Sequence, residues 1–264
     1  RLLHLFGRAD ETNSFTGLAL FGEAPEVSTP ARGLHIGGQI PVLDLAAWGA
    51  VLADGGVDGD AALVVDSVDI LAGELNILDR PFRETRVRMN RDATRVEIDL
   101  EGEALDGRLT IPVDGLVQKG ITGRFRRLHW PEAPENGATP HKSSDTMFYP
   151  ATIPPLHLES AETSFSGAQL GSLWLETYPT ADGLHVERLD AHSAAFDIKA
   201  KGDWLNNAQG ERSELALDFS TGDAGGMLSA LGFSRLIDGG ATHGQLRLSW
   251  PGAPGTFDWG VADG

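Results

Sequence analysis

The sequence predicts a mainly β protein of meandering antiparallel strands with two short helices. Apolar and polar residues alternate along many short segments, and turns containing glycine, asparagine or aspartate separate them. The chain also repeats itself, because residues 128–134 and 248–254 share the pattern Leu-x-Trp-Pro-x-Ala-Pro. Such self-similarity indicates one β-rich unit that is copied along the chain and stacks on its neighbour.

The repeat extends upstream of this shared pattern. Residues 73–77 align with 171–175, and residues 96–102 align with 196–202, in the same order both times. We therefore expect two repeat units, at 1–134 and 135–264. The second unit opens with a connecting loop at 135–155, in a stretch rich in proline, serine and threonine. A structureless loop of this length is uncommon inside a compact domain, which favours a repeat boundary there.

Alternation with a period of two identifies the strands. It is clear in 86–89, 95–100, 214–219 and 245–250, and it places the apolar side chains on one face and the charges on the other. The sequence predicts turns between strands at 92–93, 106–107, 182–183 and 206–210.

The two predicted helices are short. Asp44 can cap a helix over 45–52, and Asp223 can cap a helix over 226–231 that Gly232 ends. Helices of about ten residues are roughly 15 Å long and cannot cover more than ten strands. The apolar face must therefore be covered by a second sheet, as in a sandwich, or remain an open trough for an apolar guest.

Composition excludes several classes of function. The formal net charge is −17 and no basic stripe runs along the chain, which argues against nucleic-acid binding. There is no cysteine, so disulfides and thiolate metal sites are excluded. No apolar run approaches the roughly 18 residues of a membrane span. The abrupt ends of the chain predict an internal piece of a longer protein.

No catalytic, metal-binding or cofactor motif stands out, so we expect no enzyme activity, no metal and no cofactor. The eight histidines form no H-x-x-x-H or H-E-x-x-H pattern. Residues 54–60 lack the acidic order of a calcium loop and read as a glycine-rich turn. The G-x-S-x-G pattern of hydrolases is also missing.

Several stretches together resemble one known family. Residues 33–48 read Gly-Leu-His-Ile-Gly-Gly-Gln-Ile-Pro-Val-Leu-Asp-Leu-Ala-Ala-Trp, which is similar to a stretch of the YhdP family of AsmA-like proteins. Residues 154–160, 183–204, 212–215 and 238–254 resemble the same family in the same order. The motifs span most of residues 33–264, and their succession carries the resemblance.

The resemblance implies a segment of a long envelope protein of Gram-negative bacteria. Family members resemble bridge-like lipid transfer proteins, in which a long curved antiparallel sheet forms a repeating, taco-like β-groove. It implies that phospholipids pass between the inner and outer membranes with their acyl chains sheltered in the groove. The full-length protein is then periplasmic and anchored in the inner membrane, and parts outside this chain contact the two membranes.

Alternation identifies candidate residues for the groove lining, although the same residues suit the core of a β-sandwich. Each buried acyl methylene gains about 0.8 kcal/mol, so the lining needs no polar anchor. In the first unit the candidates are Leu63, Val65, Leu75, Ile77, Val87, Met89, Val96, Ile98, Leu100, Leu109 and Ile111. In the second unit they are Leu173, Leu175, Val186, Phe196, Ile198, Leu215, Leu217, Phe219, Leu246, Leu248 and Trp250.

The arginine-rich stretch 80–95 has two interpretations. Arg86 and Arg88 can contact lipid phosphates at a groove rim, since guanidinium binds phosphate in bidentate fashion. Alternatively, they belong to a solvated outer face balanced by the glutamates and aspartates of 97–103. Two other functions also remain: a module that binds envelope polysaccharide through tryptophans and acidic side chains, and a purely structural spacer.

Overall fold

The computed structural model describes residues 3–9, 15–22, 33–45, 65–78, 80–131, 149–165, 167–208, 210–234 and 239–257. These residues form two compact units that divide between Asp114 and Gly115. The predicted first repeat ends at 134 and so includes the strand over 121–130. In the structure this strand belongs to the second compact unit.

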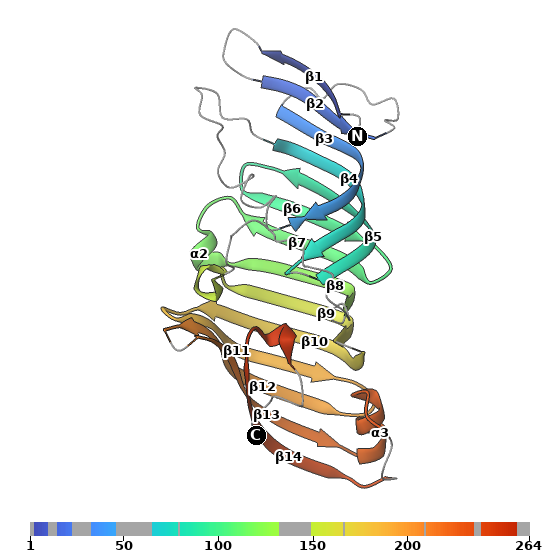
Figure 1. Ribbon diagram of the computed structural model, residues 1–264, viewed down its shortest axis with the longest axis vertical. Helices are drawn as coiled ribbons and strands as arrows, with labels where there is room; N and C mark the ends of the chain where they lie inside the picture. The colour runs from blue at the N-terminus through green and yellow to red at the C-terminus, as the bar shows by residue number, and fades with distance from the viewer. Residues whose placement is uncertain are drawn as a thin grey trace. The chain divides into compact units, whose positions relative to one another are not determined.

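The first unit contains the strands β1 to β7, each beside the strand before it (Figure 1). The pairs β2·β3 and β3·β4 are parallel, and the other pairs within this unit are antiparallel. The strands are β1 (Leu3–Ala9), β2 (Phe15–Phe21), β3 (Gly33–Asp44), β4 (Val65–Ile77), β5 (Arg80–Arg91), β6 (Arg95–Glu101) and β7 (Leu105–Pro112).

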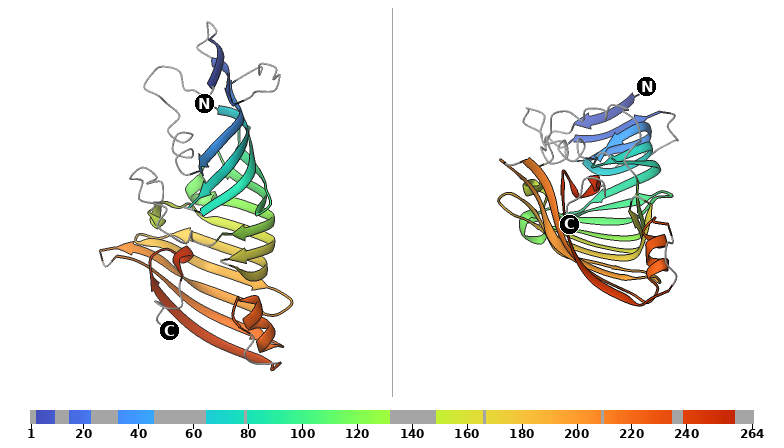
Figure 2. Two further views of the ribbon diagram at one scale, coloured as in Figure 1. Left: turned by 45° about the vertical axis from the view of Figure 1, so that its right-hand side comes forward. Right: turned by 60° about the horizontal axis from the view of Figure 1, so that its bottom comes forward.

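The second unit contains the strands β8 to β14 in chain order, and Figure 2 shows its strands bending around a concave face. Only β8·β9 is parallel among the described pairs of this unit. The strands are β8 (Ile121–Trp130), β9 (Leu156–Phe165), β10 (Ala168–Pro179), β11 (Gly183–His192), β12 (Asp197–Asn207), β13 (Gly210–Thr221) and β14 (Thr242–Pro251).

The prediction of a mainly β protein with an open sheet is confirmed. The described strands form one sheet in chain order, and no pairing among them joins its first and last strands, so the sheet stays open. The described pairs are mostly antiparallel, as expected, but three of them are parallel. Parallel neighbours require the chain to cross from one end of the sheet to the other, and the long connections before β3, β4 and β9 allow this.

Two α-helices are described, and one of them was predicted. Helix α3 (Ala224–Ala230) follows Asp223 as expected, although the Asp223 carboxylate accepts a hydrogen bond from the Gly239 N–H instead of capping the helix. Gly232 ends it with a left-handed φ of 86°, and the Phe233 N–H donates to the Leu228 carbonyl as in a Schellman motif.

The other helices are small. Helix α2 (Leu116–Lys119) was not predicted, and a single turn of this kind leaves no apolar period in the sequence. The 3₁₀ turns are η1 (Pro150–Thr152) and η2 (Pro254–Thr256). The predicted helix over 45–52 lies outside the described residues except for Leu45, as does the glycine-rich turn at 54–60.

Candidate functional site

The second unit carries a continuous apolar face that strand pairing assembles across β9 to β14. Residues paired on neighbouring strands project to the same side of a sheet, so the register shows which side chains share a face. Three rows, which together we call the apolar face, are Ser160, Leu173, Ala191, Ile198, Phe219 and Gly244; Leu158, Leu175, Leu189, Ala200, Leu217 and Leu246; and Leu156, Thr177, Val186, Gly202, Leu215 and Leu248.

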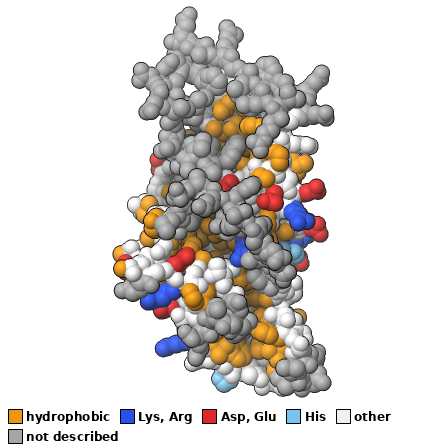
Figure 3. Space-filling model, in the orientation of Figure 1, with side chains coloured by type: hydrophobic (Ala, Val, Ile, Leu, Met, Phe, Trp, Pro, Cys, Tyr) orange, Lys and Arg blue, Asp and Glu red, His pale blue; other side chains and the backbone are white. Residues whose placement is uncertain are grey.

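Much of this apolar face remains accessible. Leu215, Leu217 and Phe219 of β13 are half-buried, and Leu246 of β14 is 44% exposed. Figure 3 shows apolar side chains gathered on the viewer's side of the lower strands, which belong to this unit. An extended, partly exposed apolar surface of this kind is a candidate binding surface.

One margin of the apolar face is closed by tryptophans. Trp204 and Trp250 are both buried, and each flanks Ser213 in the strand register. The Trp250 indole N–H donates to the Ala253 carbonyl at 3.1 Å, and its ring meets Phe257 edge-on at 5.0 Å. The shared Trp-Pro-x-Ala-Pro pattern therefore anchors the chain that follows β14.

The corresponding face of the first unit is buried over β4 to β6. Two of its rows are Val68, Met89, Ile98 and Leu109, and Ile70, Val87, Leu100 and Gly107. Ile70 is 0% and Leu100 is 1% exposed, whereas Leu109 and Gly107 of β7 are half-buried. The same alternation thus gives rows that are buried on β4 to β6 of the first unit, whereas the large side chains of β10, β13 and β14 of the second unit stay partly exposed.

The structure shows where each predicted lining residue lies. Leu63 lies outside the described residues, and Phe196 directly precedes β12. The buried ones are Leu75, Val87, Met89, Ile98, Leu100, Val186, Phe196 and Trp250. The half-buried ones are Val65, Ile77, Val96, Leu109, Ile111, Leu173, Leu175, Ile198, Leu215, Leu217, Phe219 and Leu248, while Leu246 is exposed.

Sequence reasoning missed part of the first unit's core because the alternation changes phase within β4. Ala72 and Leu75 are both buried although three positions apart. Gly73 lies between them. On the paired strand β5, Glu84 lies beside Gly73 and has a positive φ of 44°. The signal was Gly73 itself, since a glycine inside a strand often marks an irregularity. The missed core residues include Val68, Ile70, Ala72, Phe82 and Leu105.

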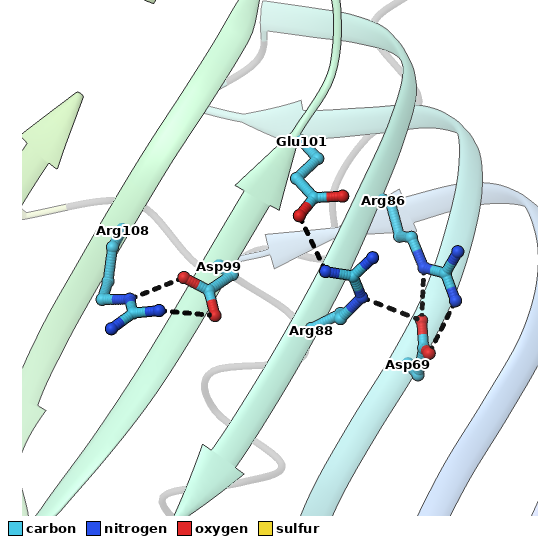
Figure 4. A network of polar contacts seen from close by, with 6 residues as sticks. All are labelled: Asp69, Arg86, Arg88, Asp99, Glu101 and Arg108. Carbon is cyan, nitrogen blue, oxygen red and sulfur yellow. Dashed lines mark hydrogen bonds and ion pairs between the residues drawn. The ribbon is translucent and has the colours of Figure 1, made fainter. Parts of the chain in front are cut away.

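The polar face of the first unit carries a network of ion pairs (Figure 4). Arg86 donates two hydrogen bonds of 2.7 Å to the Asp69 carboxylate, and Arg88 lies 2.7 Å from Glu101. Arg108 pairs with Asp99 at 2.6 Å. Paired strands place these charges beside one another. Arg86 and Arg88 thus have carboxylate partners on the face opposite the core.

This network predicts a small, pH-dependent contribution to stability. The hydrogen bond from Arg86, together with the charges of Arg86 and Arg88, holds the pKa of Asp69 below its ordinary value. The contribution is therefore complete above the unfolded pKa of about 3.9 and is lost as the pH falls through the lower folded value. Asp69→Asn should cost less than about 1 kcal/mol at pH 7, because both side chains are over a third exposed.

Urea unfolding between pH 2 and pH 7 measures this effect. The difference between the wild type and Asp69→Asn should narrow as the pH falls below about 4. An Asp69→Asn/Arg86→Gln double-mutant cycle isolates the pair. A difference that persists unchanged at pH 2 would show that the carboxylate charge is not responsible.

The tryptophans that the structure describes in the second unit do not form a single exposed line of the kind that a glycan platform requires. Trp174 is exposed on the polar side of the second unit, where its indole N–H donates to Glu176 and Arg188 lies 5.2 Å from its ring centre. Trp204 and Trp250 are buried at the margin of the apolar face.

The described residues contain no group of three or more histidine or acidic side chains that could hold a metal ion. No helix in the part of the chain that the structure describes is both long enough and apolar enough to cross a membrane.

Comparison with known proteins adds the family. No curated protein and no solved structure matches the chain. A family model described as YhdP protein matches residues 17–264, which includes every strand from β3 to β14. The chain therefore belongs to the YhdP family of AsmA-like envelope proteins.

Proposed function

We propose that this chain is a segment of a periplasmic conduit that carries phospholipids between the inner and outer membranes, and that the apolar face of the second unit shelters their acyl chains. The observation that carries the proposal is the set of three apolar rows that cross β9 to β14, in which the large side chains of β10, β13 and β14 remain partly exposed. Membership of an envelope protein family supports it.

The apolar face is long enough to hold a lipid tail. Neighbouring strands lie about 4.8 Å apart, so a row across six strands spans about 24 Å. The hydrocarbon core of a bilayer is about 30 Å thick, so each tail reaches about 15 Å. Small residues such as Ala191, Ala200 and Gly202 lie among the larger ones on the middle strands, and Ala191 and Ala200 are buried.

The chemistry of the face suits movement as well as binding. Each acyl methylene removed from water contributes about 0.8 kcal/mol, and this contribution does not depend on direction. A tail can therefore shift along equivalent rows without breaking a specific polar contact. This role is non-enzymatic and requires no cofactor. Contact with the two membranes would be made by other parts of the full-length protein.

Lipid extraction and native mass spectrometry of the purified chain test the proposal. We expect phospholipid to co-purify with the chain and detergent to displace it. A chain that is free of lipid, and that does not take up phospholipid from labelled vesicles, would contradict the proposal and favour a structural spacer.

A further inference from the structure

The tryptophan margin of the apolar face is itself a fourth row. Two positions beyond the row that contains Val186, strand pairing joins five residues of β10 to β14, which we call the margin row: Pro179, Leu184, Trp204, Ser213 and Trp250. Residues two positions apart project to the same side of a strand, so the margin row faces the same side as the apolar face. All of them except Pro179 are buried. The chain after β14 covers one end of the row, since the Ser213 hydroxyl donates to the Gly252 carbonyl at 2.9 Å.

The turn η1 covers another part of the margin row. We call residues 149–153, which contain this turn, the cover. The turn contacts β10, β11 and β12, and the Pro150 side chain within it is fully buried. On these strands Leu184 and Trp204 of the margin row are buried, whereas Tyr178 on the polar side is 44% exposed. The cover therefore lies on the apolar side of the sheet.

Exposure along the neighbouring row follows the position of the cover. In the row that contains Val186, Thr177 of β10 and Val186 of β11 are buried. Leu215 of β13 and Leu248 of β14 belong to the same row and are half-buried. The side chains beside the cover are thus withdrawn from solvent, and those farther along the row are not.

The cover is closed on itself and is fixed at one end. The Thr152 N–H and hydroxyl donate to the Tyr149 carbonyl at 2.9 and 2.8 Å. Pro150 has no N–H with which to bond to the sheet. Beyond the cover, the Pro155 carbonyl accepts a hydrogen bond of 2.7 Å from the Ile121 N–H of β8. The bonds that shape the turn would therefore survive its displacement about Pro155.

The buried part of the cover has the chemistry of an acyl chain. The ring of Pro150 consists of methylene groups, and the benefit of removing such groups from water does not depend on direction. An acyl chain carries the same groups in a line, so it can replace the ring. Displacement of the cover would add the margin row to the apolar face and widen the face by about 7 Å along the strands.

We propose that residues 149–153 are a displaceable cover that regulates how much of the apolar face is open to acyl chains. An acyl chain that reaches β11 and β12 takes the place of Pro150, and the cover moves out about Pro155. The inference rests on the proposed function, because it assigns regulation to the same face.

Thiol labelling tests the displacement, because the chain contains no cysteine. In Pro150→Cys the new thiol is buried while the cover is in place. Labelling by a water-soluble maleimide should accelerate at least about threefold when phosphatidylglycerol vesicles are added, because lipid shifts the population toward the open form. Ala224→Cys is the control, since Ala224 is buried in α3 and lies outside the cover. Its labelling rate should stay unchanged. An equal acceleration in both variants would show a general loosening of the unit and would overturn the proposal.

Lipid uptake by a variant with a weakened cover is the second measurement. Pro150→Asp places a carboxylate where the ring is buried, which favours the open form. Uptake of phosphatidylglycerol from vesicles, followed by native mass spectrometry, should rise at least about threefold, because the open fraction no longer limits binding. Thr152→Asp adds the same charge at an exposed position of the same turn and should leave uptake unchanged.

The two measurements separate the cover from the proposed function. If the wild type takes up lipid while labelling of Pro150→Cys stays constant, the cover is not displaced and this inference fails, whereas the proposed lipid binding stands. Uptake by Pro150→Asp that exceeds uptake by the wild type supports both. Absence of uptake by the wild type and by Pro150→Asp contradicts both.

Discussion

Leu217→Asp is expected to remove bound phospholipid and leave the chain folded. Leu217 lies in the middle row of the apolar face, between Ala200 and Leu246 in the register, and is half-buried. An aspartate in contact with acyl chains costs about 2.5–3.5 kcal/mol, which corresponds to roughly 100-fold weaker lipid occupancy. Because the side chain already reaches solvent, the free energy of unfolding should fall by only about 1 kcal/mol.

Ala216→Asp is the matched control for this change. It adds the same charge one position earlier on the same strand, and its exposed side chain points to the opposite face. Lys201 and Arg247 are its partners across the neighbouring strands, so the new carboxylate lies between two cations. Lipid content by mass spectrometry and folding by circular dichroism should be unchanged. Equal lipid loss in both variants would show that charge on this strand, and not contact with the apolar face, causes the loss.

Phe82→Ala should produce the largest loss of stability. The Phe82 side chain is 0% exposed and lies opposite Leu75, which is also fully buried, in the first unit. Truncation leaves a cavity that close-packed neighbours fill only in part, and such changes cost about 3–5 kcal/mol. The urea midpoint of the first unit, followed by circular dichroism, should fall by more than about 1 M.

Leu71→Ala is the control for this second prediction. Leu71 lies on the adjacent strand β4, is 39% exposed and stands opposite Arg86 on the polar face. Its truncation creates no internal cavity and should cost less than about 1 kcal/mol. If both truncations cost the same, the assignment of the two faces in β4 is wrong.

The contrast between Leu217 and Phe82 tests whether the two units differ in function. Leu217 lies on the apolar face of the second unit, and Phe82 lies in the buried core of the first unit. A polar change in a surface that binds a guest alters occupancy, whereas a cavity in a closed core alters stability. Phe82→Ala should therefore lower the stability of the first unit, and Leu217→Asp should lower the lipid content of the second.

The alternating strands could be predicted because their signal is local. Segments such as 95–100 and 214–219 have a period of two, and strand pairing then places Ile98 and Leu217 on the apolar side as expected. The ion-pair partners of the arginines could not be predicted in this way, because the paired residues are far apart in the sequence. Asp69 lies 17 positions before Arg86 in the chain, and only the β4·β5 register brings their side chains together.

Several features depended on contacts that no single segment encodes. The alternation changes phase at Gly73. A Cβ added to Gly73 would lie 3.0 Å from the Pro41 carbonyl oxygen on the neighbouring strand. The parallel pairing of β8 and β9 depends on how the chain returns after Trp130, and strand propensity is the same for parallel and antiparallel neighbours.

The sequence alone determined the strand content, the repeat and the family, since each is written in the order and spacing of residues. Only the tertiary structure decided that the apolar rows are buried on β4 to β6 of the first unit and partly exposed on β10, β13 and β14 of the second. Alternation specifies that one side of a sheet is apolar, but solvent exposure depends on what lies over that side. The partly exposed side chains of the second unit are a property of the folded sheet, and the proposed lipid contact rests on them.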